Sequence, residues 1–156
     1  MKKLVLAVGL LGLLGGISSC KKDDKKDAGG STTGGGMGTW TFNGQTHTVT
    51  KATRNSNSIA YYDEALNSVS VMFKEYPTAN GTYHLTDGSL EGNKVMVLTN
   101  NISPFLGGGA DFDDVKTLAV TVKGGKIGVS ATDISMITTT PDGTKGTAKL
   151  SMNVSE

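Results

Sequence analysis

Apolar and polar residues alternate along much of the chain between Thr39 and Glu156. Val69, Val71 and Phe73 share one parity, while serine, methionine and lysine take the positions between them. The same period of two recurs over residues 117–131 and 148–154. Because successive side chains of a strand point to opposite faces, this alternation predicts β-strands with one buried face.

Turn-forming pairs separate the alternating segments. Asn43-Gly44 follows the segment that contains Trp40 and Phe42, and Gly124-Gly125 follows another. Both pairs suit the tight turns of β-hairpins. Apolar residues change parity after Ala131, so we expect a bulge or bend near Thr132-Asp133.

These patterns predict about eight or nine strands in residues 39–156 and no helix, since threonine, serine, valine and glycine are mediocre helix formers. The expected fold is all-β, an antiparallel β-sandwich. A lipocalin-like β-barrel is the alternative. Short strands with irregular spacing favour the sandwich.

The N-terminus has the features of a signal peptide over residues 1–19. Lys2 and Lys3 precede an apolar run over residues 4–17, which is too short to cross a hydrocarbon core of about 30 Å as a helix. The end of this run, Ser18-Ser19-Cys20, resembles the bacterial lipobox. The resemblance implies that the thiol of Cys20 is lipidated and that Cys20 becomes the first residue after cleavage. Cys20 is the only cysteine, so an internal disulfide is excluded.

Residues 20–38 form a predicted tether between the lipid and the domain. Charged residues follow the cysteine directly, and a glycine- and serine-rich run comes next, a composition typical of flexible linkers with a span of roughly 20–25 Å. The charged run begins with Lys21, Lys22, Asp23 and Asp24. It resembles the surface-export signal of Bacteroidota-type lipoproteins, which implies an outward-facing domain on the outer membrane. A charged spacer on a protein that faces the periplasm is the alternative.

Three segments of the domain carry a wider resemblance. Residues 39–44, 77–83 and 146–151 are similar to those of small Bacteroidota-type lipoproteins of uncharacterised function. Their shared positions are turns and core residues. The resemblance therefore implies an envelope location and an all-β fold, and it transfers no catalytic residue or cofactor.

The charge balance argues against nucleic-acid binding. Removal of residues 1–19 takes away two lysines and leaves 13 basic against 14 acidic side chains. Arg54 is the only arginine, and the lysines form no basic stripe of the kind that binds phosphates. The expected partners are the membrane, through the lipid, and an unidentified glycan or protein.

The densest carboxylate cluster of the domain is a candidate calcium site. Asp111, Asp113 and Asp114 follow Gly107-Gly108-Gly109, in what reads as a flexible glycine-rich loop. Calcium takes six to eight oxygen ligands, and these carboxylates would supply some of them. The spacing differs from that of an EF-hand, and a solvated acidic loop is the alternative.

Tyr61, Tyr62 and Tyr76 are candidate ligand-binding residues. The first two are adjacent, so one of them should face outward from a strand, and Tyr76 precedes a proline in a predicted loop. An exposed tyrosine ring can stack on the C–H face of a sugar or anchor a protein. Tyrosine is also a common strand former, which is the competing explanation.

No combination of residues indicates an enzyme. His47 and His84 are expected at the surface, and their spacing matches no zinc motif. A Gly-x-Ser-x-Gly segment is also absent from the sequence. The sequence predicts a non-enzymatic, lipid-anchored binding or structural module without a cofactor. The alternatives are an envelope hydrolase that uses adjacent carboxylates such as Asp63 and Glu64, and a barrel that carries a small apolar ligand.

Overall fold

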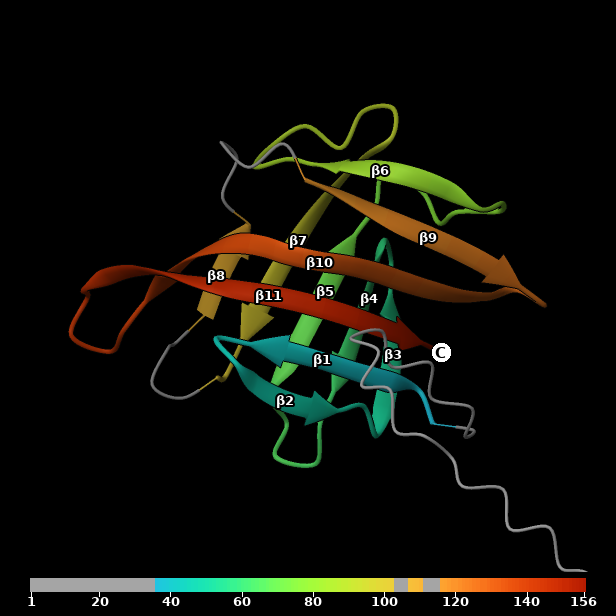
Figure 1. The fold of residues 1–156 in the computed structure, drawn as a ribbon. Coiled ribbons are helices and arrows are strands. Elements are labelled where there is room, and N and C mark those ends of the chain that lie inside the picture. The colour runs from blue at the N-terminus through green and yellow to red at the C-terminus, as the bar shows by residue number, and fades with distance from the viewer. Residues whose placement is uncertain (1–35, 103–106, 111–115) are drawn as a thin grey trace, which may run out of the picture. The chain divides into compact units, whose positions relative to one another are not determined.

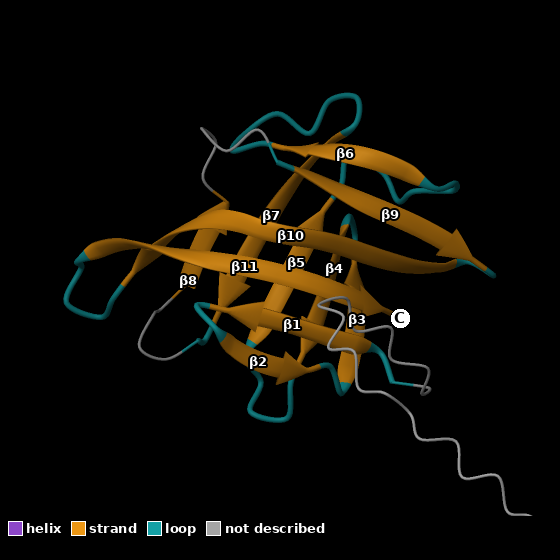
Figure 2. Cartoon of the chain, viewed as in Figure 1, coloured by secondary structure: helices purple, strands orange, loops and turns teal. Residues whose placement is uncertain are grey.

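The computed structural model describes residues 36–102, 107–110 and 116–156. This part of the chain contains eleven strands, and Figure 2 shows the described residues between them as loops and turns. None of the described residues belongs to a helix that would be long and apolar enough to span a membrane. The strands are β1 (Gly38–Phe42), β2 (Gln45–Thr48), β3 (Lys51–Asn55), β4 (Ser58–Tyr62), β5 (Ser68–Met72), β6 (Gly81–Leu85), β7 (Lys94–Asn100), β8 (Gly107–Ala110), β9 (Thr117–Lys123), β10 (Lys126–Thr139) and β11 (Lys145–Ser155).

The strands form one hydrogen-bonded sheet that folds into two layers. Its order is β2-β1-β11-β10-β9-β6-β7-β5-β4-β3, with antiparallel neighbours except for the parallel pair β6–β7. In Figure 1, β2, β1, β11, β10, β9 and β6 run steeply across β7, β5, β4 and β3. We call these the first and the second layer. β8 pairs with both β10 and β7, so hydrogen bonds connect the layers on this side as well.

The prediction of an all-β fold is confirmed, and the two layers enclose the core of a sandwich whose hydrogen bonding continues between the layers as in a barrel. The strand count of eight or nine was too low. The glycine-rich segment expected to be a flexible loop includes strand β8. Glycines have no apolar alternation, so the sequence pattern missed this strand.

Side chains from both layers fill the core, and those of β1 and β11 follow the predicted parity. Trp40 and Phe42 of β1, Ile59 and Tyr61 of β4, and Leu150 of β11 are each at most 1% exposed. The predicted bulge is also present, because the register of β10 on β11 shifts between Ala131 and Ile134. The parity change thus keeps both halves of β10 facing the same core.

Candidate binding groove

Two rows of side chains cross the outer face of the sheet from the second layer over β8 onto strands of the first layer. The register of β4, β5, β7, β8, β10 and β11 aligns the members of each row directly opposite one another. The first, here the Tyr62 row, consists of Tyr62, Ser68, Asn100, Gly107, Thr139 and Lys145. The second, here the Leu98 row, consists of Ala60, Ser70, Leu98, Gly109 and Ile137.

Both rows line a groove with a volume of about 720 Å³. A volume of this size is within the range of ordinary ligand sites. Ile137 is 39% exposed, which is unusual for a large apolar side chain among the described residues, and it lines the groove in the same row as Leu98. Of the described residues that line the groove, only Lys145 carries a formal charge. The surface therefore combines apolar contacts, hydroxyl and amide groups, and one cation.

Gly109 lies in the floor of the groove, and packing does not require a glycine there. A Cβ atom at Gly108 would lie 2.8 Å from the carbonyl oxygen of Ile137, so that position has no room for a side chain. A Cβ atom at Gly109 would meet only the Cδ2 atom of Leu98, at the ordinary contact distance of 3.7 Å. The backbone at Gly109 is also outside the left-handed region. The missing side chain at Gly109 is what keeps this part of the groove open.

Of the three predicted ligand-binding tyrosines, Tyr62 lines the groove. Tyr61 points to the other side of β4 and is fully buried, and its hydroxyl donates to the carbonyl oxygen of Ile127 at 3.3 Å. Burial raises the pKa of Tyr61 far above its usual value, so the hydroxyl stays protonated. Tyr61 therefore belongs to the core and presents no ring face to a ligand.

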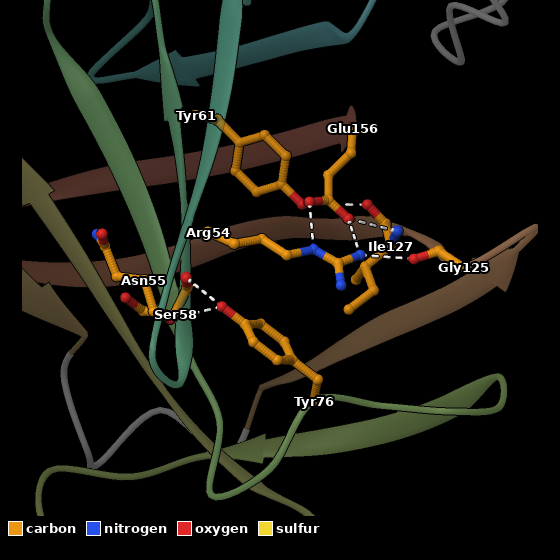
Figure 3. Close-up of polar contacts among 8 residues, drawn as sticks. All are labelled: Arg54, Asn55, Ser58, Tyr61, Tyr76, Gly125, Ile127 and Glu156. Carbon is orange, nitrogen blue, oxygen red and sulfur yellow. Dashed lines mark hydrogen bonds and ion pairs between the residues drawn. The ribbon is translucent and has the colours of Figure 1, made fainter.

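Tyr76 is part of a polar cluster at another edge of the second layer (Figure 3). Its hydroxyl lies 2.5 Å from the carbonyl oxygen of Asn55 and 2.8 Å from that of Ser58. The guanidinium group of Arg54 lies 5.0 Å from the centre of its ring, a cation–π arrangement. Because both its hydroxyl and its ring contact other residues of the protein, Tyr76 stabilises the β3–β4 hairpin.

The same cluster connects the two layers. Arg54 of β3 donates to both carboxylate oxygens of Glu156, at 2.6 and 2.5 Å, and also to the carbonyl oxygen of Gly125 (Figure 3). The backbone amide of Ile127 donates to Glu156 as well, at 2.8 Å. The hydrogen bonds from Arg54 lower the pKa of Glu156, which keeps the carboxylate ionised at neutral pH. This clamp holds β3 against the β9–β10 hairpin, a structural function.

A second polar cluster is buried, and it corrects the expectation that His47 lies at the surface. His47 is 4% exposed, and its ring is stacked on Trp40 with centroids 3.8 Å apart and an angle of 8° between the planes. Its Nδ1 atom lies 2.7 Å from Asp63. Two features of the sequence favour burial of His47. It has the same parity as the apolar Val49, and the Asn43-Gly44 turn places it opposite Trp40. His84 is exposed, as predicted.

Asp63 also accepts two hydrogen bonds from Asn67, one from the backbone amide at 2.9 Å and one from the side chain at 2.7 Å. Burial by itself raises the pKa of Asp63, but the hydrogen bonds from Asn67 and His47 outweigh it and lower the pKa. The ionised carboxylate can only accept, so Nδ1 of His47 carries a proton. The Nε2 atom of His47 is buried and has no hydrogen-bond partner among the described residues. A general base needs to reach its substrate, and this nitrogen does not reach the surface.

Several predicted site residues lie outside the described residues. These are the lipidation site Cys20, the export-signal residues Lys21, Lys22, Asp23 and Asp24, and the calcium candidates Asp111, Asp113 and Asp114. Within residues 36–102, 107–110 and 116–156, no three histidine, cysteine or carboxylate side chains are grouped as metal ligands. The groove is thus the feature of the described residues that best suits a ligand.

No protein-family model, curated protein or solved structure matches this chain.

Proposed function

We propose that the protein is a lipid-anchored, outward-facing and non-enzymatic binding module of the bacterial outer membrane, and that the groove across β4, β5, β7, β8 and β10 is its ligand site. The observation that carries this proposal is the open floor at Gly109, where neither the backbone nor the packing excludes a side chain. The lipobox-like segment that ends at Cys20 supports the anchor, and the glycine-rich composition that follows is typical of a linker that would let the groove meet a ligand away from the lipid.

Binding fits the groove better than catalysis does. Acid–base catalysis needs a titratable group beside the reacting atoms, and the groove lining contains no aspartate, glutamate, histidine or cysteine among the described residues. The carboxylate of Asp63, which the hydrolase alternative would use, accepts hydrogen bonds from His47 and Asn67 instead. An enclosed cavity for a small apolar ligand is not supported either, because apolar side chains from the two layers pack against one another in the space between the layers.

Replacement of Cys20 by alanine tests the anchor. The variant should fold normally but move from the membrane fraction to the soluble fraction, and it should no longer incorporate labelled palmitate, because the thiol that receives the lipid is gone. Ser19→Gly is a useful control, since it changes the same segment and keeps the thiol. Retention of the Cys20→Ala protein in washed membranes would contradict lipid anchoring.

Replacement of residues 21–27 by a glycine–serine segment of the same length tests the outward orientation. The change removes the charges that resemble an export signal but keeps Cys20 and the length of the tether. We expect the variant to remain lipidated and membrane-bound, and to become protected from proteinase on intact cells. Equal digestion of both proteins would reject the export signal, and protection of the native protein would indicate the periplasmic side.

A further inference from the structure

We infer that the groove binds a linear acidic oligosaccharide, whose chain runs along the two rows and across the strands. This inference rests on the proposed function, because it specifies the ligand of the same groove. Three properties of the described residues carry it: the different chemistry of the two rows, the pairing of the strands beneath them, and the charge at one end.

The two rows match the two kinds of surface that a sugar chain presents. The Tyr62 row offers an aromatic ring at one end, then the amide of Asn100 and the hydroxyl of Thr139, while Ser68 between the ring and the amide is buried. The Leu98 row offers the apolar side chains of Leu98 and Ile137 on either side of Gly109. A sugar ring has hydroxyl groups at its edge and C–H groups on its faces. It can therefore place the hydroxyls along one row and the C–H groups along the other.

The strands beneath the groove disfavour an extended peptide. A peptide gains most of its affinity for a sheet by pairing its main chain with an unpaired edge strand. β4, β5, β7, β8 and β10 each have a strand neighbour on both sides. A ligand here has to bind through the side chains of the two rows, so it must present polar groups along one side and apolar groups along the other. Sugars meet this requirement irrespective of sequence.

The charge of the groove favours an acidic sugar. Lys145 stands at the end of the Tyr62 row opposite the ring of Tyr62, and the residues of the described chain that line the groove include no carboxylate to repel an anion. The row spans six strands, and the five spacings between them, at ~4.8 Å each, give about 24 Å along the sheet. The length suits several linked sugars rather than one.

The test is calorimetric titration of the full-length lipoprotein in detergent with three probes: hexagalacturonate as an acidic glycan, cellohexaose as a neutral glycan, and hexaglutamate as an acidic peptide. We expect hexagalacturonate to bind, with an affinity that falls as salt is added. Gly109→Val should abolish measurable binding because the side chain fills the floor. Ala119→Val, on the outer face of the first layer, is the matched control and should bind like the native protein.

Two further variants separate stacking from charge. Tyr62→Ala should weaken hexagalacturonate binding about tenfold, while Tyr62→Phe should keep most of it, because the phenylalanine ring still stacks. Lys145→Gln should remove the preference for the acidic over the neutral hexasaccharide.

The outcomes distinguish the ligand class from the groove itself. Binding of hexaglutamate alone, lost in Gly109→Val, would overturn the glycan assignment but keep the groove as a binding site. Hexagalacturonate binding that is equal in Gly109→Val and Ala119→Val would overturn both the inference and the proposed role of the groove. The absence of binding to both hexasaccharides would overturn the glycan assignment.

Discussion

Replacement of Trp40 by alanine is expected to lower the free energy of unfolding by about 3–5 kcal/mol, as other large-to-small changes of buried aromatic residues do. Trp40 is 1% exposed, pairs with Met152 of β11 on one side and with His47 of β2 on the other, and stacks on the His47 ring. Its removal leaves a cavity and also withdraws the support under His47. A loss of this size is a large part of the 5–15 kcal/mol that typically stabilises a domain.

Urea unfolding followed by circular dichroism measures this loss without relying on Trp40, the only tryptophan of the chain. Trp40→Phe is the matched control. It keeps an aromatic ring on His47 and removes the indole N–H, which is buried without a partner among the described residues, so its cost should stay below about 1.5 kcal/mol. Equal stability of Trp40→Ala and Trp40→Phe would contradict the importance of the buried volume.

Asp63→Ala should have the second-largest effect, a loss of about 3 kcal/mol at neutral pH. The carboxylate accepts one hydrogen bond from His47 and two from Asn67, and each buried donor left without an acceptor costs about 1–3 kcal/mol. The contact with His47 also connects β2 to the segment after β4, so its loss should loosen the edge where the two layers meet. Unfolding at neutral pH measures the size of the effect.

Acidification provides an independent test of Asp63. The pKa of Asp63 is lower in the folded protein than in the unfolded chain, so the folded state binds fewer protons at acidic pH. The ionised carboxylate of Asp63 therefore makes its full contribution to stability above the unfolded pKa of about 3.9. It is then lost as the pH falls through the folded pKa. The native protein should therefore become less stable below about pH 4.

Asp63→Asn is the control for this dependence. Asparagine preserves the shape of the side chain but does not titrate, so stability should fall less steeply with acid, while Glu156 still contributes through Arg54. The same slope in the native protein and in Asp63→Asn would show that Asp63 is not responsible.

The sequence by itself determined which side chains face the core and where the chain turns. The parity of Val69, Val71 and Phe73 predicted their burial, and the parity change after Ala131 predicted the bulge. These features are local, because the pleat of a strand sends each side chain to the face opposite its neighbours. The burial of His47 had the same local signal and was misassigned because a polar residue was expected to be exposed.

Only the tertiary structure decided which distant residues lie together. The groove depends on the placement of β8 between β7 and β10, and the glycines of β8 have no alternation that would predict a strand. Arg54 meets Glu156 across 102 positions of the chain, and His47 meets Asp63 across 16. Alternation specifies the face on which a residue lies, but the neighbour of each strand and their register follow from the packing of the whole core. For that reason Tyr61, Tyr62 and Tyr76 were equivalent candidates in the sequence, while in the structure only Tyr62 lines the groove.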